Sequence, residues 1–194
     1  MVPGQPQTLE SGKARQAHFG AVDDLAALIQ PLIRDVPDFP QPGVLFRDLT
    51  PVFADAAAFR AAVQALVAPV GQVDVVVGVE ARGFLLGAAA AYALRAGVVG
   101  VRKPGKLPVI CDREGYALEY GSTALELPHG VLHPGQRVLV VDDVLATGGT
   151  VAATCALVER AGATICEIAV LLEIAALGGR QRLAGRPLRS VLTV

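Results

Sequence analysis

The sequence predicts an α/β fold with a central, mostly parallel sheet of five strands flanked by helices. Two segments carry this prediction, residues 73–96 and 138–161, because each has a valine-rich apolar run, a glycine-containing turn and then a helical stretch. An uninterrupted apolar run is typical of a strand that is buried on both faces, as in a parallel sheet covered by helices. Repeated strand–turn–helix units therefore favour a layered α/β domain.

The individual elements follow from the same patterns along the chain. Helices are predicted where apolar residues recur at helical spacing, at residues 21–36, 56–67, 84–96 and 151–161. Asp55 is placed to cap the second helix, and Gly97 and Gly162 follow the last residues of the third and fourth. Strands are predicted at the apolar runs 73–79, 98–101, 138–141, 164–174 and 188–194, with a short basic turn or helix at 177–185.

Composition narrows the class of protein. The 194 residues are enough for one domain with a substantial core. The net charge of −1 gives no indication of nucleic acid or a membrane surface as a partner, and no apolar run reaches the roughly 18 residues of a membrane span. Three cysteines, an odd number without close spacing, indicate reduced thiols and a cytoplasmic protein.

The N-terminal quarter of the chain divides into three parts. Residues 1–19 are rich in glycine, proline and glutamine, which predicts a disordered tail without the apolar segment of a secretory signal. The helix at 21–36 is ended by the prolines that follow it. Those prolines predict a rigid, irregular segment at 37–51, anchored by Phe39 and Phe46, that presents main-chain groups with little entropy to lose on binding. A plain proline-rich connector is the alternative interpretation.

The most informative stretch is residues 138–150, where a buried strand ends in two aspartates and a small-residue turn leads into a helix. Glycines let the backbone approach a ligand closely, and the amides at a helix start favour a phosphate. The two carboxylates would repel that phosphate, so they suit sugar hydroxyls or a magnesium ion. A ribose 5-phosphate offers both kinds of group, and its predicted binding residues are Asp142, Asp143, Ala146, Thr147, Gly148, Gly149 and Thr150.

This stretch resembles the signature of the type I phosphoribosyltransferases, which bind 5-phosphoribosyl 1-diphosphate. It is not a Walker loop, because no Gly-Lys-Ser/Thr ends it. The alternative is a strand that ends in solvated aspartates, with glycines that serve only the turn. The resemblance implies the type I phosphoribosyltransferase fold over residues 20–194, with a small hood built from residues 20–50 and 104–127 over the site.

Residues 37–48 resemble the base-binding loop of the adenine phosphoribosyltransferases, which has the pattern Pro-Asp-Phe-Pro-x-Pro-Gly-x-x-Phe-Arg-Asp. The resemblance implies that the main chain of Leu45 pairs with the edge of adenine. It also implies that Phe46 and Arg47 lie beside the base.

Two further segments resemble diphosphate-binding parts of the same family. Residues 80–83 follow a buried strand and open a helix, and a non-proline cis peptide is expected there, at Glu80–Ala81 or Ala81–Arg82. Residues 102–108 have three cations around a Pro-Gly turn, which from composition alone would be a solvated loop. Val109 stands where the family commonly has glycine. The resemblance assigns diphosphate contacts to Glu80, Ala81, Arg82, Arg102, Lys103 and Lys106, the last reaching from a neighbouring subunit.

Residues 110–127 alternate between polar and apolar around Gly121, which predicts an antiparallel hairpin. Its stretch 116–121 resembles the family's lid over the active site. The resemblance implies that Glu119 is the catalytic acid or base near the purine and that Tyr120 covers the reacting centre. An exposed strand carboxylate is the alternative for Glu119. A lid excludes water, whose attack on the activated sugar would compete with transfer.

Together these resemblances imply transfer of the phosphoribosyl group from 5-phosphoribosyl 1-diphosphate to adenine, which gives AMP and diphosphate in purine salvage. They imply a cytoplasmic homodimer and Mg²⁺ bound with the substrate diphosphate rather than at a dedicated protein site. Two alternatives remain. A transferase for another purine, such as xanthine, would share residues 138–150 but not the 37–48 loop. A regulator that senses the sugar diphosphate would need an added DNA-binding domain and a basic face.

Overall fold

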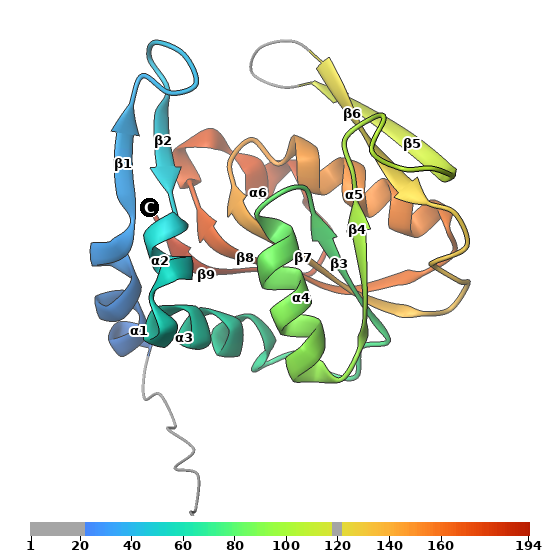
Figure 1. The fold of residues 1–194 in the computed structure, drawn as a ribbon, viewed down its shortest axis with the longest axis horizontal. Helices are drawn as coiled ribbons and strands as arrows, with labels where there is room; N and C mark the ends of the chain where they lie inside the picture. The colour runs from blue at the N-terminus through green and yellow to red at the C-terminus, as the bar shows by residue number, and fades with distance from the viewer. Residues whose placement is uncertain (1–21, 118–121) are drawn as a thin grey trace, which may run out of the picture.

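The structure, a computed structural model, describes residues 22–117 and 122–194, and its centre is a sheet of five parallel strands (Figure 1). All four neighbouring pairs are parallel, so the predicted sheet is confirmed and has no antiparallel member. In spatial order the strands are β4 (Gly97–Val101), β3 (Val75–Val79), β7 (Arg137–Leu145), β8 (Thr164–Glu173) and β9 (Leu188–Thr193).

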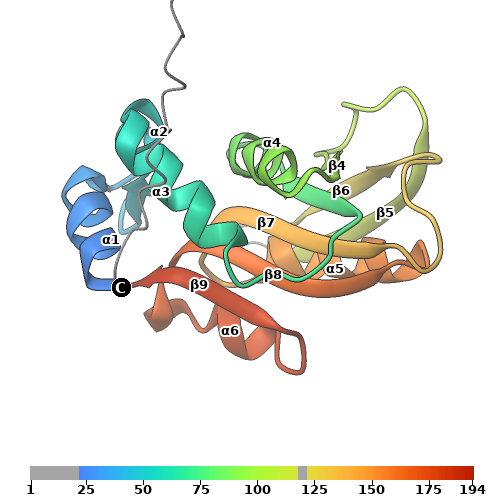
Figure 2. The same ribbon diagram turned by 90° about the horizontal axis from the view of Figure 1, so that it is seen from below.

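Helices cover both faces of this sheet. The helices α3 (Ala56–Val67) and α4 (Gly83–Leu94) lie on one face, and α5 (Gly149–Arg160) lies on the other together with the short α6 (Gly179–Arg182), as Figure 2 shows. Asp55 caps α3 as predicted, since its carboxylate accepts from the amides of Ala57 and Ala58 at 3.0 and 2.8 Å. A 3₁₀ turn, η2 (Ala175–Leu177), precedes α6.

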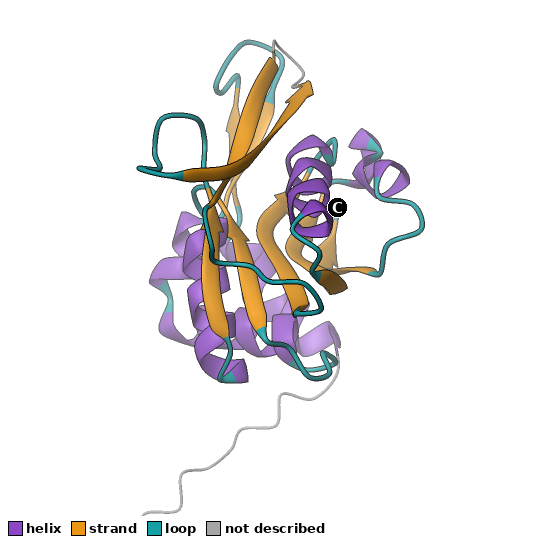
Figure 3. Cartoon of the chain, turned by 90° about the vertical axis from the view of Figure 1, so that its right-hand side faces the viewer, coloured by secondary structure: helices purple, strands orange, loops and turns teal. Residues whose placement is uncertain are grey.

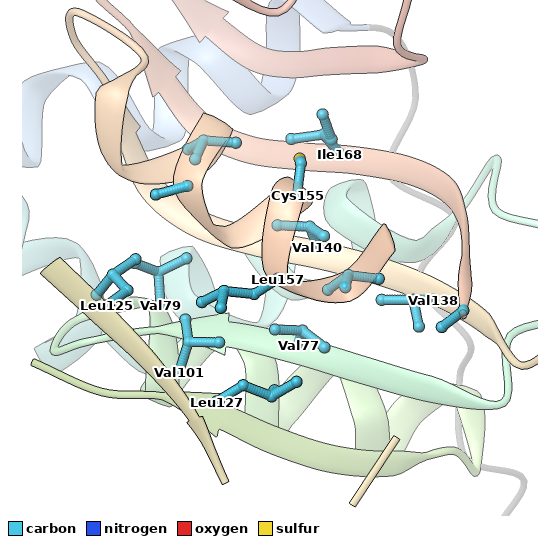
Figure 4. Close-up of a cluster of buried hydrophobic side chains, with 14 of the residues drawn as sticks. Val77, Val79, Val101, Leu125, Leu127, Val138, Val140, Cys155, Leu157 and Ile168 are labelled. Carbon is cyan, nitrogen blue, oxygen red and sulfur yellow. The ribbon is translucent and has the colours of Figure 1, made fainter. Parts of the chain in front are cut away.

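Two separate cores result from the alternation of side chains along each strand. Val77 and Val140 face α5 and pack with the hairpin residues Leu125 and Leu127 (Figure 4). Their neighbours on the opposite face, such as Val76, join α3 and α4 in the second core. Full burial of a valine or leucine stabilises the fold by about 1.5–3 kcal/mol. The side chains on both faces of the central strands therefore pack in the cores and are not available for binding. Chemistry is therefore left to the ends of the strands.

The order of the strands determines which ends come together. From β3 the chain crosses through α4 to β4 on one side, whereas from β7 it crosses through α5 to β8 on the other. The crossovers thus diverge between β3 and β7. In open α/β sheets, ligands bind outside the carboxyl ends of the strands at such a switch point.

The N-terminal region departs from its prediction. The helix predicted at 21–36 ends early, as α1 (Val22–Ile29) followed by the 3₁₀ turn η1 (Gln30–Leu32). Residues beyond it form the strand β1 (Arg34–Pro37), which pairs antiparallel with β2 (Leu45–Asp48). The prediction of a helix to residue 36 and of a wholly irregular 37–51 segment was therefore wrong. A proline inside the first stretch disfavours a continued helix, and pairing with a distant strand completes the change.

The hairpin connection brings the two predicted aromatic anchors together. Phe39 and Phe46 meet edge to face, with ring centroids 5.0 Å apart. The peptide bond between Phe39 and Pro40 is cis. A short helix, α2 (Thr50–Ala54), leads from β2 towards α3. These contacts give the proline-rich segment one defined shape beside the main sheet.

The predicted hairpin at 110–127 is confirmed as the antiparallel pair β5 (Ile110–Ala117) and β6 (Ser122–Pro128). Figure 3 shows it as a separate pair of strands beside the main sheet. Arg102, just after β4, forms an antiparallel bridge with Glu126 of β6. The hairpin is thereby joined to the edge of the main sheet. The predictions for the tail at 1–19 lie outside the described residues.

Candidate functional site

A cleft of about 530 Å³ lies at the switch point between β3 and β7. This volume is in the range of pockets that bind small molecules or cofactors. The cleft brings together residues from four segments that the sequence singled out separately, namely Phe46, Arg47, Glu80, Ala81, Arg82, Lys103, Asp142, Asp143, Ala146 and Thr150. Four further lining residues were not predicted as ligand contacts: Tyr116, Thr123, Val144 and Ile174.

The glycine loop, residues 146–150, forms a small pocket of about 60 Å³ that is lined only by residues 144–151. Gly148 has a φ of +77° and stands directly before α5, so the loop amides gather at the start of a helix of three turns. The left-handed backbone at Gly148 favours glycine. A helix start carries partial positive charge and free amides, which suits a phosphate group. Thr147 and Gly149, as well as Ala146 and Thr150, line this pocket.

The glycine loop is supported from behind by α6. A Cβ atom on Gly179 would lie 2.2 Å from the carbonyl oxygen of Ala146, and one on Gly148 would lie 2.7 Å from the carbonyl oxygen of Gly179. Only glycine at both places allows this approach. Gly179 was not predicted as a functional residue, although the Gly178-Gly179 pair at the start of the basic turn was a visible signal.

The acidic pair, Asp142 and Asp143, is buried at the carboxyl end of β7, with 8% and 5% of each residue exposed. Burial raises the pKa of Asp142 well above its usual value, and the charge of Asp143 raises it further. Burial also raises the pKa of Asp143, although Arg82 opposes this. The amide of Asp143 donates to Asp142 Oδ1 at 2.9 Å. These carboxylates are therefore accessible only from the cleft, and a donor there would stabilise their ionised form.

Arg82 connects the acidic pair to the proline-rich hairpin. Its Nε lies 2.8 Å from Asp143 Oδ2, but off the hydrogen-bonding direction, so that oxygen and Arg82 Nη1 lack a hydrogen-bond partner among the described residues. The guanidinium also lies over the Phe46 ring, 4.9 Å from its centroid. Buried polar groups normally have partners, so unsatisfied ones in a cleft indicate where a ligand binds.

The basic loop, residues 102–106, is held against the same cleft by Glu80. Glu80 Oε2 accepts from Arg102 Nε at 3.0 Å and from the Lys103 amide at 2.8 Å. Burial alone would raise the pKa of Glu80, but the Lys103 amide and Arg102 outweigh it and lower that pKa. The peptide bond between Glu80 and Ala81 is cis, at one of the two positions predicted. Lys103 lines the cleft, whereas Lys106 is exposed and does not.

The remaining predicted site residues are placed less centrally or lie outside the described chain. Leu45 is exposed on β2 and does not line the cleft, although only its main chain was predicted to bind. Arg47 lines the cleft and pairs with Asp35 across the hairpin. Glu119 and Tyr120 lie outside the described residues, so their predicted roles stay predictions.

The cleft also fits a metal ion that arrives with a phosphorylated ligand. Mg²⁺ in phosphate-handling sites usually binds through one or two carboxylates, waters and the substrate's own phosphate oxygens. Asp142 and Asp143 both line the cleft. Beside them, the basic loop and the glycine loop provide donors for anions. The donor set therefore suits a divalent cation shared with a diphosphate.

An open parallel sheet with an anion pocket, an acidic pair and a cationic loop at its switch point defines a protein that binds a phosphorylated sugar. The profile of the phosphoribosyl transferase domain matches residues 55–184. The chain belongs to the phosphoribosyltransferase family, and within it to the adenine phosphoribosyltransferases. This second assignment depends on relatives such as the adenine phosphoribosyltransferase of Clavibacter michiganensis, 62% identical over 167 residues that cover 86% of this chain and 95% of that protein.

Solved structures agree with this assignment. The crystal structure of adenine phosphoribosyltransferase from Rhodothermus marinus is 46% identical, with a TM-score of 0.85 over 89% of this chain and 99% of that one. The enzyme from Saccharomyces cerevisiae, crystallised with adenine and an imino-altritol bisphosphate, is 36% identical, with a TM-score of 0.82 over 88% and 99%. In the described part of this chain, no helix has both the length and the apolar character needed to cross a bilayer.

Proposed function

We propose that the protein transfers the 5-phosphoribosyl group from 5-phosphoribosyl 1-diphosphate to adenine, giving AMP and diphosphate in purine salvage. The observation that carries this proposal is the convergence of an anion pocket, an acidic pair and a cationic loop on one cleft that also contains Phe46. Each part matches a different portion of the two substrates. The names of the relatives support adenine as the acceptor.

The sugar is held at the C-terminal side of β7 in this proposal. The amides and hydroxyls of the glycine loop bind the 5′-phosphate, and Asp142 and Asp143 accept from the ribose hydroxyls. As diphosphate leaves, carbon 1 of the ribose gains positive charge, which the buried carboxylates stabilise. Because both ends of the ribose phosphate are fixed, much of the rate enhancement comes from positioning.

The leaving diphosphate is held by the loop after β3 together with the basic loop. Arg82, Lys103 and the amides around Ala81 act within this chain, Arg102 is available once its pairing with Glu80 is exchanged, and Lys106 acts from a neighbouring subunit. Mg²⁺, when bound with the diphosphate, neutralises part of its charge. Cations and amides aimed at a developing negative charge are the usual means of stabilising such a transition state.

Adenine binds between the hairpin β1–β2 and the acidic pair. The main chain of Leu45 pairs with the base edge, and Phe46 and Arg47 lie beside the ring. Adenine offers an amino donor where guanine and hypoxanthine offer an oxo acceptor. A mispaired buried group costs about 1–3 kcal/mol, so this edge selects the base. Glu119, by its place in the lid motif, acts as acid or base near the purine, and Tyr120 covers the reacting centre. Residues 20–50 and 104–127 form the hood over the cleft.

The protein acts as a homodimer in the cytoplasm. The sequence of α4, GFLLGAAAAYAL, has no charged residue, and a helix that is apolar all round is normally buried on all sides. Yet Leu85 and Tyr92 are 55% and 89% exposed. This exposed apolar face supports the dimer, because a second copy would cover it. The partner would then lie close to the basic loop. The three cysteines are unpaired, which supports the cytoplasm.

The deciding experiment measures AMP formation from 5-phosphoribosyl 1-diphosphate, Mg²⁺ and adenine, with hypoxanthine, guanine and xanthine in parallel, for wild type and Glu119→Ala. Turnover of adenine alone, with a large loss in the variant, is the expected result. Preference for a 6-oxopurine would show that the role given to residues 37–48 is wrong. Binding of the sugar diphosphate without turnover of any base would favour a regulator.

A further inference from the structure

Glu126 is a fully buried carboxylate, 0% exposed, that does not line the cleft and has no part in the proposed chemistry. It lies on β6, and its cross-strand partner on β5 is Arg113, whose guanidinium pairs with Glu126 Oε1. Its other oxygen, Oε2, accepts from the amide of Gly105 at 3.3 Å. A buried carboxylate is costly unless it is paired, so these contacts are the reason this charge is tolerated.

The backbone of Glu126 makes a second connection to the same loop. Its amide donates to the Arg102 carbonyl oxygen at 2.7 Å, and its carbonyl oxygen accepts from the Arg102 amide at 2.9 Å. The basic loop is therefore fixed to β6 at its first residue by backbone pairing and at Gly105 by a carboxylate. Gly105 has a φ of +76°, so the loop turns sharply where Glu126 holds it.

Two carboxylates thus bind the same short loop through its amides. Glu80 accepts from the Lys103 amide on the side of β3, and Glu126 accepts from the Gly105 amide on the side of β6. At the first of these two points Lys103 lines the cleft. Without these two contacts, repulsion between the three cations of the loop would favour other loop conformations.

We propose that Glu126 is a positioning residue that holds the basic loop in the conformation that presents its cations to the diphosphate, and that it couples this loop to the β5–β6 hairpin through Arg113. The inference rests on the proposed function for the identity of the ligand. It concerns the diphosphate end of the site alone, because the Glu126 carboxylate accepts from Gly105 and Arg113 rather than from the glycine loop or the acidic pair.

The first test compares wild type with Glu126→Gln by titration calorimetry, with Mg²⁺-diphosphate and with AMP as separate ligands. Gln keeps an acceptor for the Gly105 amide but loses the charge that pairs with Arg113. Diphosphate affinity is expected to fall about tenfold, the usual scale for a hydrogen bond to a charged group, while AMP affinity stays within about twofold. A matched control is Glu159→Gln on α5, which removes a carboxylate paired with Arg186.

An equal loss of affinity for both ligands would overturn the proposal, because it would indicate a general loss of stability. Unchanged affinity for both would overturn it as well, because the loop would then not depend on Glu126. Amide hydrogen exchange provides a readout that needs no ligand. Exchange at residues 102–106 is expected to accelerate in Glu126→Gln and to stay unchanged in Glu159→Gln, and unchanged exchange in Glu126→Gln would also overturn it. Failure of the wild type to bind diphosphate would instead refute the proposed function, while the exchange result still decides the role of Glu126.

If Glu126→Gln does not fold, Arg113→Met serves in its place, because the Arg113 side chain is more than half exposed. It removes the only ionic partner of Glu126 among the described residues and is expected to weaken diphosphate binding in the same selective way. An unchanged diphosphate affinity in this variant would contradict the coupling between the hairpin and the loop.

Discussion

Glu80 Oε2 lies 3.0 Å from Arg102 Nε, so one of the cations assigned to the diphosphate is already paired with a carboxylate of the chain itself. The same oxygen takes the Lys103 amide at 2.8 Å. Glu80 therefore already accepts from two donors of the basic loop, Arg102 Nε and the Lys103 amide, that a bound diphosphate could otherwise use. A bound diphosphate has to compete with this internal partner.

Replacing Glu80 by glutamine is expected to tighten diphosphate binding, because an acceptor remains for the loop while the repelling charge is lost. The Glu80 side chain is only 13% exposed, but it lines a cleft that is open to solvent, so screening limits the gain to about 1 kcal/mol, or roughly fivefold in Kd. Calorimetric titration with Mg²⁺-diphosphate measures it, with Glu167→Gln as a control at a distant ion pair. Weaker binding in Glu80→Gln would mean that the charge itself is needed to hold the loop.

Asp142→Asn is expected to stabilise the ligand-free protein while it abolishes most activity. Burial and the charge of Asp143 raise the pKa of Asp142 in the folded chain. An acid with a raised folded pKa opposes folding at any pH above its unfolded pKa, and each pKa unit corresponds to about 1.4 kcal/mol. The cost grows as the pH rises from about 3.9, the unfolded value, until it passes the folded pKa, and is constant above.

The difference in Tm between Asp142→Asn and wild type should therefore be largest at neutral pH and should vanish near pH 4. Thermal unfolding of both proteins across this range measures it. Asn retains the acceptor that binds the Asp143 amide, so the comparison isolates the charge. A Tm difference that does not depend on pH would contradict this explanation.

Gly179→Ala is expected to weaken binding of AMP and of 5-phosphoribosyl 1-diphosphate, but not of diphosphate. The added Cβ would lie 2.2 Å from the Ala146 carbonyl oxygen and would push the glycine loop out of place. Because the loop holds only the 5′-phosphate, a loss of tenfold or more should be confined to ligands that carry it. Gly71→Ala is the control, since its Cβ would meet nothing within 4 Å. Equal binding of AMP by both variants would refute the supporting role of α6.

Phe46→Ala should raise the KM for adenine while leaving the affinity for diphosphate nearly unchanged. In the proposed site this ring lies beside the base, and an aromatic pair contributes about 0.5–1.5 kcal/mol beyond its buried area, or roughly 2- to 13-fold in KM. Steady-state kinetics with varied adenine measures the effect. Phe39→Ala should raise the KM for adenine less, because Phe39 contacts Phe46 but does not line the cleft. A larger effect in Phe39→Ala would place the base elsewhere.

Leu85→Glu is expected to yield a monomer. A charge in the middle of the exposed apolar face of α4 would have to be buried if a second copy packs there. Sedimentation equilibrium of wild type and variant measures the mass in solution, and Gln64→Glu on the exposed side of α3 controls for the added charge. A variant that remains a dimer would assign the interface to another surface.

The sheet and most of its helices could be predicted because their signals are local. The apolar, β-branched run at Val75–Val79 predicts a buried strand by its own composition, and Asp55 caps the helix that follows it directly. Arg34–Pro37 could not be predicted, because two charges and a proline form a strand only through pairing with Leu45–Asp48. The residue types of the cleft were also visible in the sequence, as short motifs at the ends of strands.

What the sequence did not contain was the pairing between distant segments. Nothing local indicates that Arg82 approaches Asp143 or that Glu126 accepts from Gly105, because both contacts depend on how strands and loops are placed side by side. Gly179 was passed over for the same reason. Its lack of a side chain matters only because the glycine loop lies against it. Motifs therefore revealed the ligand groups, and the fold revealed what supports them.

The contact between Gly148 and Gly179 has a consequence for how the protein is made. The glycine loop leaves the ribosome well before α6 does, yet α6 is the surface against which the loop takes its shape. A nascent chain that ends before α6 has the whole motif at residues 138–150 but lacks its support. Affinity for the sugar phosphate should thus arise only once α6 has also been made, so chains terminated before α6 would not sequester the substrate.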